Sequence, residues 1–338
     1  MQDGRGGKMK SGHKWLLGSF FISLHLVCGS LTEGAEKTLS KIRVGYVAPT
    51  ADNVLVAVAQ KKDFFKKHGV EVELIAIRGG VQSTQAILSN SIQFAQMAGS
   101  VVVRAVLSGG DVVMIAGFIN RINYLLVSRP EITSAKDLLG KRVASASIGG
   151  SVDTILRLGL KGLGVDPASI IILPAGPPQS RLAALSTGQM DATLVAPESL
   201  DAVEKAGLKI LKDLSDVEVY VQHTGLVVRR DLLRENRELA KNFLLAIIDA
   251  IDFYRTQERE ALEIMQKFTG IKDPRALRSS YTFHKKLFLQ PPYVRPEGFQ
   301  TVIELIAASE PKARNVQPEL FFDNGVLDEL KPKELKRK

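Results

Sequence analysis

From residue 41 onward, the apolar positions of the chain follow two alternating spacings. Short apolar runs such as "KIRVGYV" at 41–47 and "VEVELIAI" at 70–77 are typical of strands. Between them, "NVLVAVAQKKDFFKKHG" at 53–69 repeats apolar residues at helical spacing and ends on a glycine. Strands that alternate with helices of this length predict crossover connections and a mainly parallel sheet.

Two series of this kind follow one another along the chain. The first continues with helices expected at 81–90 and 100–110 and strands at 91–98 and 111–118. A second series starts after "NRIN" at 120–123 and again alternates the two patterns. It predicts strands at 124–128, 141–147, 169–175 and 190–196, and helices at 134–140, 149–164, 178–188 and 200–207.

The two series share a local pattern. "TQAILSNSIQFAQMAGS" at 84–100 and "LAALSTGQMDATLVAPE" at 182–198 both run from a helix through a small polar turn into a strand that stops at small residues. After "VYVQHTGLVVRRDLL" at 219–233 the chain becomes mainly helical, as in 239–257 and 299–309. We expect these last helices to pack back onto the first series.

The predicted fold class is therefore α/β with two lobes, each a mainly parallel sheet flanked by helices. Lobe 1 is expected to be discontinuous, at 41–120 plus 224–330, and lobe 2 to span 121–223. The chain then passes between the lobes twice, near 118–123 and 221–225, and this makes a two-strand hinge. Loops at the carboxyl ends of the strands would face a shared cleft, which is where α/β sheets bind ligands.

The first thirty residues have the composition of an export signal. Four basic residues precede the apolar run "WLLGSFFISLHLV" at 15–27, which is shorter than the ~20 residues that a spanning helix needs. We expect residues 1–29 to be cleaved. A lipoprotein acylated at Cys28 is the weaker alternative, because Val27 before it is large. Cys28 is the only cysteine, so the mature chain has neither a disulfide nor a cysteine nucleophile.

Composition and charge limit the number of domains and the kinds of ligand that the protein can bind. A chain of 338 residues with 45% hydrophobic and 24% charged residues fits two core-forming units. Residues 1–29 hold four basic residues and one acidic residue, so their removal lowers the formal net charge from +9 to +6. Scattered charge of that size suits solubility better than nucleic-acid binding. The basic tail "KPKELKRK" at 331–338 is expected to be solvated.

The sharpest candidate for ligand contact is the loop at Gly149, Gly150 and Ser151, between a strand and a helix. It lacks the lysine of a nucleotide phosphate loop, but free backbone N–H groups at a helix start favour an anion or a carbonyl oxygen. The alternative is plain capping by Ser151, with Asp153 complementing the helix dipole. Gly79 and Gly80 recur at the equivalent place in the first series.

One helix start cannot bind a solute alone, because it contributes roughly 0.3–2 kcal/mol whereas micromolar binding requires about 8 kcal/mol. Several loops must converge. For Thr50, Asn53 and Ser100, capping is as good an interpretation as ligand contact. Arg78, Arg121 and Arg181 border the expected cleft, although arginines at such places are also typical of solvated faces. The full set of predicted ligand residues is Pro49, Thr50, Asn53, Gly79, Gly80, Ser100, Arg121, Gly149, Gly150, Ser151, Ala196, Pro197 and Glu198.

Catalytic and metal patterns are weak. Outside the export signal the histidines are His68, His223 and His284, which are far apart in sequence and lack metal-binding spacing. We interpret His68 as a partner of a helix end and His223 as a hinge or surface residue. We predict no cofactor, no metal and no catalytic residue.

A family resemblance rests on three blocks in order: residues 42–80, "SAKDLLGKRVASASIGGSVD" at 134–153, and "LAALSTGQMDATLVAPE" at 182–198. Together they resemble the nitrate/sulfonate/taurine-binding family of ABC-importer solute-binding proteins, which includes receptors for pyrimidine precursors of thiamine. The resemblance implies a type II periplasmic binding fold and a monomer in the periplasm. It also implies that the protein delivers a small anionic or polar solute to a membrane permease. The ATPase of that importer is then an indirect partner.

The sequence departs from the family where ligands are expected. "APTAD" follows the first strand where relatives often have an aromatic or a second polar residue, and Glu198 would repel a sulfonate. This favours a solute with hydrogen-bond donors or a positive group. Two alternatives stay open. One is an enzyme on the same fold, although the cysteine-rich iron motif of the similar yeast synthases is absent. The other is the effector domain of a regulator.

Overall fold

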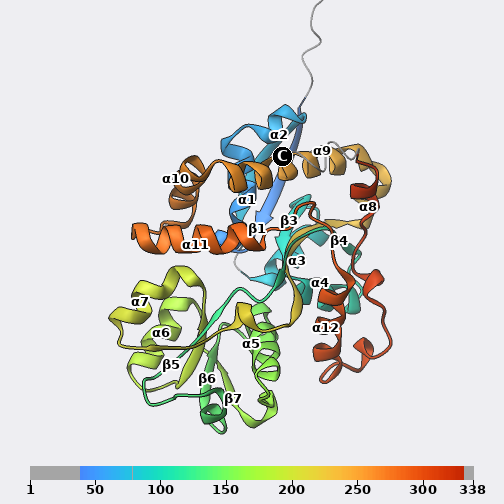
Figure 1. The fold of residues 1–338 in the computed structure, drawn as a ribbon. Coiled ribbons are helices and arrows are strands. Elements are labelled where there is room, and N and C mark those ends of the chain that lie inside the picture. Colours follow the sequence, from blue (N-terminus) through green and yellow to red (C-terminus); the bar gives the residue numbers. More distant parts are fainter. Residues whose placement is uncertain (1–38, 78, 331–338) are drawn as a thin grey trace, which may run out of the picture. The chain divides into compact units, whose positions relative to one another are not determined.

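The computed structural model describes residues 39–77 and 79–330. The predicted export signal, Cys28, Arg78 and the basic tail lie outside the described residues. Figure 1 shows the elements in the colours of the sequence. No helix in this described part is long and apolar enough to cross a membrane.

The first sheet has the strand order β2-β1-β3-β10-β4. The first three of these strands are parallel, and β10 is antiparallel to both of its neighbours. Its strands are β1 Ser40–Tyr46, β2 Val70–Ala76, β3 Phe94–Met97, β4 Val112–Arg121 and β10 Tyr220–Arg229.

The second sheet repeats the plan, with the order β7-β6-β8-β5-β9. Here β5 takes the antiparallel position of β10. Its strands are β5 Leu125–Ser128, β6 Arg142–Ser145, β7 Ile171–Pro174, β8 Ala192–Val195 and β9 Lys209–Asp213. The predicted α/β fold of two mainly parallel sheets is therefore confirmed. The edge strand β9 was not predicted, because its short sequence "KILKD" has no clear alternation and no fully buried position.

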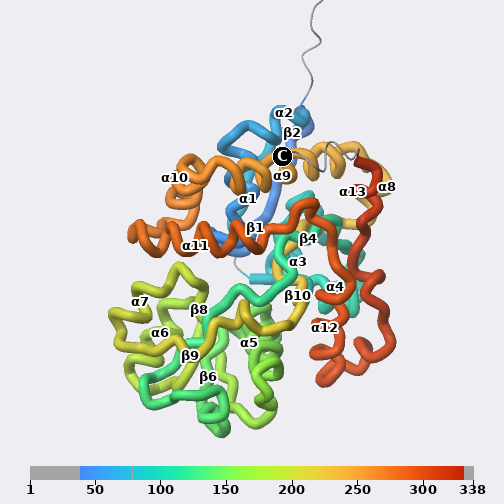
Figure 2. Tube along the Cα trace, in the orientation of Figure 1, coloured from blue at the N-terminus to red at the C-terminus, as the bar shows by residue number. Residues whose placement is uncertain are grey.

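Each antiparallel strand enters its sheet directly from the other sheet. β4 leads into β5 through residues 122–124, and the segment after β9 leads into β10. Tyr220 pairs with Arg121 in the strand register, so the two connections run side by side, as Figure 2 shows. This is the predicted two-strand hinge. The sheet and helices on either side of it are called the first and second lobe below.

Helices cover both faces of the first sheet. One face packs on α1 Val54–Lys61, α2 Phe64–Lys67 and α9 Arg237–Thr256, where Phe94 stacks on Phe243 with ring centroids 4.2 Å apart. The sequence had predicted one helix over 53–69. The chain instead forms η1 Ala51–Asn53, α1 and α2, because Asp63 adopts a left-handed conformation (φ 54°) that ends the first helix.

The other face packs on α3 Gly80–Leu88, α4 Gly99–Leu107 and α12 Pro296–Ala307. The second lobe carries α5 Ser151–Gly162, α6 Pro178–Ser186 and α7 Leu200–Lys205. The remaining elements are α8 Arg230–Glu235, α10 Glu258–Thr269, α11 Pro274–Leu287, α13 Gly325–Asp328, η2 Ala135–Leu138, η3 Pro167–Ser169, η4 Pro197–Ser199, η5 Leu214–Asp216, η6 Pro311–Ala313 and η7 Pro318–Leu320.

Two of the C-terminal helices, α9 and α10, contact α1 of the first lobe. In Figure 1 the orange α9 and α10 lie beside the blue α1 and α2. Helix α11 differs from them, because it contacts η1 of the first lobe and η4 of the second. It therefore brings residues of both lobes together near the hinge.

Candidate functional site

Six polar or ionisable residues meet where η1, the hinge, η4 and α11 come together. We call Asp52, Tyr124, Glu198, His223, Ser280 and His284 the interlobe cluster. Asp52 lies in η1, directly after the turn that follows β1. The Oδ2 atom of Asp52 is 3.3 Å from Nε2 of His223, which is close enough for an ion pair but does not have the geometry of a hydrogen bond. The same Oδ2 atom accepts a hydrogen bond of 3.5 Å from the hydroxyl of Thr224.

His223 and Tyr124 lie on the two hinge segments. The ring of Tyr124 meets the ring of His223 edge to face, with centroids 5.7 Å apart. His223 is buried although it lies in the apolar strand β10. Of the two interpretations of His223, a hinge or a surface residue, the structure supports the hinge, because β10 crosses between the lobes and buries this side chain.

Glu198 and α11 form the other half of the interlobe cluster. The hydroxyl of Ser280 donates a hydrogen bond of 3.2 Å to Oε2 of Glu198. Ser280 and His284 are both fully buried on one face of α11, four residues apart. The Nδ1 atom of His284 lies 2.8 Å from the backbone oxygen of Ser280. A side chain of the second lobe is thus bonded to a helix that packs on the first.

The two carboxylates have opposite electrostatic environments. Burial by itself would raise the pKa of Asp52, but the adjacent His223, the charge of His284 and the hydroxyl of Thr50 outweigh burial and lower that pKa to about 2. Burial raises the pKa of Glu198, and His284 and the Ser280 hydroxyl only partly offset this. Asp52 is therefore ionised at neutral pH, whereas Glu198 gains a proton more readily.

Several polar atoms of the first sheet and the hinge are buried without a hydrogen-bond partner among the described residues. They include both side-chain polar atoms of Gln96, Oδ1 of Asn123 and Nδ1 of His223. Gln96 lies near the carboxyl end of β3, where it pairs with Leu226 of β10, and Asn123 precedes Tyr124 in the hinge. A buried polar group left unpaired costs ~1–3 kcal/mol, so a polar molecule bound here would stabilise the protein.

Arg181 is close to this region, but its donors are used by the second lobe itself. It is buried, and its guanidinium donates to the oxygens of Gly176 (2.7 Å) and Leu194 (3.0 Å) and to the hydroxyl of Thr193 (3.1 Å). The interpretation of Arg181 as a solvated residue was wrong, since α6 turns its side chain into the second lobe. Its charge holds the β8 end in place.

The predicted first-lobe ligand residues are placed as follows. Thr50 accepts a hydrogen bond of 3.0 Å from the side chain of Asn53, so both organise the loop that carries Asp52. Gly79 has φ of 94° before α3, and a Cβ on Gly80 would lie 2.5 Å from Val101, which shows close packing of α3 on α4. Pro49 is exposed in the same loop as Asp52, and Ser100 is buried in the first turn of α4.

The glycine loop of the second lobe is capped differently from the prediction. The N-cap of α5 is Gly150, and Ser151 is the first helical residue, with no side-chain capping bond. Oδ2 of Asp153 accepts the N–H of Gly149 at 2.8 Å, so Asp153 is the capping group. A side chain at Gly149 would approach Arg104 of α4, so this loop lies against the first lobe.

Among the predicted second-lobe residues, Ala196 and Pro197 begin η4 and position Glu198 in the interlobe cluster. Arg121 lies elsewhere, over the ring of Tyr220 at the outer end of the hinge. Of the interlobe cluster, sequence reasoning predicted only Glu198 as a site residue. It missed Asp52, Tyr124, His223, Ser280 and His284. The available signal was the presence of ionisable side chains inside segments that are otherwise apolar or small.

The geometry argues against nucleophilic catalysis by Ser280. Its hydroxyl lies 3.4 Å from Nδ1 of His284, which resembles a serine–histidine pair. However, the nearer neighbour of Nδ1 is a backbone oxygen, which can only accept. Nδ1 therefore carries a proton and cannot take one from the serine. In the described part of the chain, no group of His, Cys, Asp and Glu side chains is arranged to hold a metal ion.

Comparison with known proteins gives consistent matches. The sequence pattern of the family described as NMT1/THI5 like matches residues 51–261. A Brucella abortus chain named as a binding protein, BAB2_1146, is 23% identical over 258 residues, which cover 74% of this chain and 78% of the relative.

Two solved structures share the fold. The periplasmic aliphatic sulphonate binding protein SsuA from Escherichia coli has a TM-score of 0.70 and 20% identity, with 88% of this chain and 94% of that chain covered. A ligand binding component of an ABC-type import system from Staphylococcus aureus, with zinc bound, has a TM-score of 0.68 and 18% identity, with 86% and 98% covered. The architecture is thus the type II periplasmic binding protein fold.

Proposed function

This chain belongs to the NMT1/THI5-like family, and from that premise we propose that it is the solute-binding component of an ABC importer. It captures a small polar solute between its lobes outside the cytoplasm and delivers it to a membrane permease, without chemistry of its own. The lobes that we infer are residues 41–120 with 224–330 and residues 121–223. Export by cleavage of residues 1–29 is part of this proposal.

The observation that carries the proposal is the buried, unsatisfied polar surface at the hinge. Gln96, Asn123 and His223 bury polar atoms that lack partners in the described ranges. Of these three, His223 lies beside the ionised Asp52. Packing favours apolar groups at such positions, so unsatisfied polar groups are retained there for a ligand. A solute that pairs with them recovers the cost of their burial on binding.

Solute binding is coupled to closure of the two lobes, because the interlobe cluster contains residues from both lobes. Asp52 comes from η1 and His223 from the first sheet, whereas Glu198 comes from η4 after the second sheet. A solute that contacts both sets binds the closed form better than an open form and shifts the population toward it. The paired hinge strands β4 and β10 provide the place where the lobes rotate.

The charges of the interlobe cluster favour a solute with hydrogen-bond donors, or a positive group, over a sulfonate. The carboxylates of Asp52 and Glu198 act from opposite lobes, and the guanidinium of Arg181 is used by backbone oxygens. An anion near two carboxylates would be repelled, whereas an amine or amide donor pairs with them. The solute therefore differs from the sulphonate named for the E. coli neighbour.

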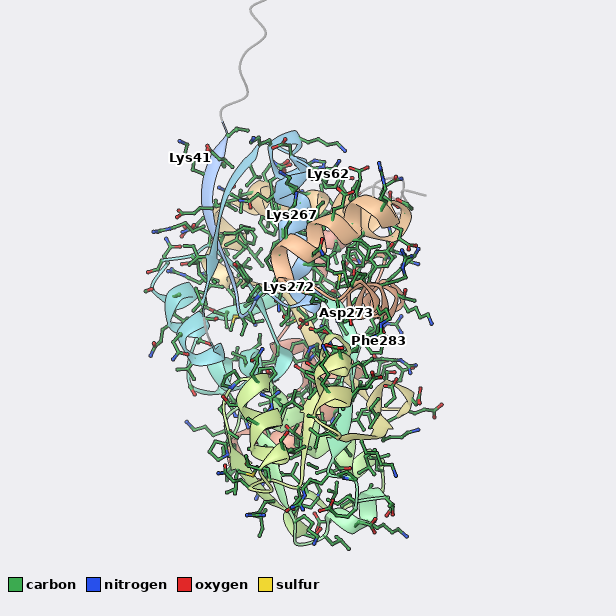
Figure 3. All side chains as sticks on the ribbon, turned by 90° about the vertical axis from the view of Figure 1, so that its left-hand side faces the viewer. Lys41, Lys62, Lys267, Lys272, Asp273 and Phe283 are labelled. Carbon is green, nitrogen blue, oxygen red and sulfur yellow. The ribbon has the colours of Figure 1, made fainter. Side chains whose placement is uncertain are left out.

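The test is recovery of the solute from the protein itself. The mature protein is purified from the envelope of cells grown in rich medium and denatured, and the released small molecules are identified by mass spectrometry. We expect the parent protein to release one solute that carries hydrogen-bond donors. The variant Lys272→Ala, which changes an exposed residue (Figure 3), is the control and should release the same solute. The variant Asp52→Ala should release none of it. Calorimetric titration with the identified solute then gives the affinity of each variant. Retention of the same solute by Asp52→Ala, or its conversion into a product during incubation, contradicts the proposal.

A further inference from the structure

A second polar site lies at the outer end of the hinge. We call it the hinge pocket: about 190 Å³ lined by Asn120, Arg121, Tyr220, Lys286 and Arg295, with Leu287 and Leu289. It shares no residue with the interlobe cluster. Its ionisable lining is basic, whereas the interlobe cluster contains two carboxylates.

The fold brings these residues together from three separate parts of the chain. Arg121 and Tyr220 are register partners on the two hinge strands, β4 and β10. Lys286 lies in the last turn of α11, and Arg295 is the N-cap of α12. The segment between these helices is fixed across β4, because the N–H of Leu289 donates to Phe118 and the N–H of Gly117 donates to Pro292 at 2.9 and 2.8 Å.

The three cations of the hinge pocket have no acidic partner. No ion pair joins Arg121, Lys286 or Arg295 to a carboxylate of the residues that the structure describes. By contrast, Arg129 and Arg142 both form ion pairs with Asp191. Like charges that line one small pocket repel each other. A bound anion would remove that repulsion, so the charge arrangement favours one.

The hinge pocket is also preorganised to donate hydrogen bonds. The guanidinium of Arg121 lies over the ring of Tyr220, 5.1 Å from its centroid, and donates to the Tyr220 hydroxyl at 3.5 Å. This contact fixes the guanidinium plane and leaves its other N–H groups free to donate. Asn120 is 95% buried, and its Nδ2 has no acceptor in the described part of the chain.

We propose that the hinge pocket binds a small oxyanion through Arg121, Lys286 and Arg295, with Asn120 as a further donor. The chemical class is a carboxylate, phosphate or sulfonate group, whose oxygens match the planar fork of arginine. The hinge pocket takes an anion, whereas the interlobe cluster takes a donor-bearing solute. A bound anion ties the hinge strands to the segment between α11 and α12, so it stabilises one hinge position.

The test is a titration of the mature protein with inorganic phosphate, monitored through the amide signals in NMR spectra. Chloride is the compensating salt that keeps the ionic strength constant. We expect saturable shifts at the amides of Arg121, Tyr220 and Arg295, and weaker binding by at least tenfold in Arg121→Gln and Arg295→Gln. The control Lys272→Gln, an exposed cation outside the hinge pocket, should bind phosphate like the parent. Methanesulfonate and acetate, titrated in the same way, define which oxyanions are accepted.

Linear shifts spread over surface cations, Lys272 among them, would overturn the proposal, as would unchanged phosphate binding in both arginine variants. Thermal unfolding of each variant verifies that it is folded before titration. The Asp52→Ala variant separates the two sites. It should lose the solute of the interlobe cluster and keep phosphate binding, so the failure of either proposal is seen without the other.

Discussion

Oδ2 of Asp52 lies 3.3 Å from Nε2 of His223, although one residue is in the first turn after β1 and the other is in the last strand of the same sheet. Both side chains are mostly buried, with 17% and 4% of their surfaces exposed. The pair exists because β10 returns from the second lobe and crosses the loop that carries η1. It sets the charge of the interlobe cluster.

Asp52 is expected to stabilise the fold above its depressed pKa. Its pKa is 3.8 ordinarily and about 2 in the folded protein, so the stabilisation is present above pH 4 and is lost as pH falls through 2. A shift of this size corresponds to roughly 2 kcal/mol. Asp52→Asn should therefore lower the free energy of unfolding by about that amount at pH 6, and the difference should vanish near pH 2.

Urea unfolding of parent and variant from pH 2 to 7 measures this difference. The control is Asp216→Asn, since Asp216 is exposed and forms only a surface ion pair with Lys212. That variant should change the free energy by less than ~1 kcal/mol at any pH. A deficit for Asp52→Asn that persists unchanged at pH 2 would show that the aspartate acts through shape rather than charge.

Glu198 is expected to cost stability at neutral pH. Burial raises its pKa above the ordinary 4.5, so the free energy of unfolding falls as pH rises through 4.5 toward the folded pKa. Glu198→Gln keeps an oxygen for the Ser280 hydroxyl and removes the buried charge. It should raise the melting temperature of the ligand-free protein at pH 7 but not at pH 4, while weakening solute binding.

Melting curves at the two pH values and calorimetric titration check this trade-off. Glu319→Gln, on an exposed turn, is the matched control and should change neither quantity. A lower melting temperature at pH 7 for Glu198→Gln would contradict the assignment of Glu198 as a destabilising carboxylate.

The start of α5 depends on Asp153 rather than on Ser151. Asp153 accepts the N–H of Gly149 and forms an ion pair of 3.0 Å with Arg157. Asp153→Ala should lower the free energy of unfolding by ~1–2 kcal/mol, as loss of a capping group does. Ser151→Ala should change it by only a few tenths, and the reverse ranking in urea unfolding would restore the serine as the cap.

Gly150 is predicted to lie against the solute. Its backbone conformation (φ −77°) accepts any residue, and an added Cβ would lie 2.5 Å from the hydroxyl of Ser147, which can rotate away. Gly150→Val should therefore leave ligand-free stability nearly unchanged and weaken solute binding by more than tenfold, about 1.4 kcal/mol. Calorimetric titration that finds parental affinity would place the solute away from this loop.

Solute binding is expected to close the lobes. The hydrogen bond between Ser280 and Glu198 joins α11, which contacts η1 of the first lobe, to η4 of the second lobe. Small-angle scattering should give a smaller radius of gyration for the parent with its identified solute than without it. Asp52→Ala, which does not bind, should show no contraction, and an unchanged radius in a solute-saturated parent would rule out a hinge.

The amino-acid pattern alone determined most of the local structure and the class of fold. Apolar runs and helical spacing identified eight of the ten strands, β1 to β8, because each element buries a face that its own sequence must supply. Interruptions of a helix at a single residue were harder to predict from the sequence. The helix predicted at 53–69 is interrupted at Asp63, which carries no glycine or proline signal.

Only the tertiary structure decided which polar residues meet. His223 and His284 both act on Asp52, and Glu198 meets Ser280, because β10 crosses between the sheets and α11 spans both lobes. Such contacts depend on strand order and helix placement. The hydrophobic period of a single element shows which of its faces is buried but not which element lies against that face. For the same reason Arg181, which has the sequence context of a surface residue, is buried and bonded to backbone oxygens. The sequence therefore determined the elements and the family, and the packing of the two lobes determined the chemistry between them.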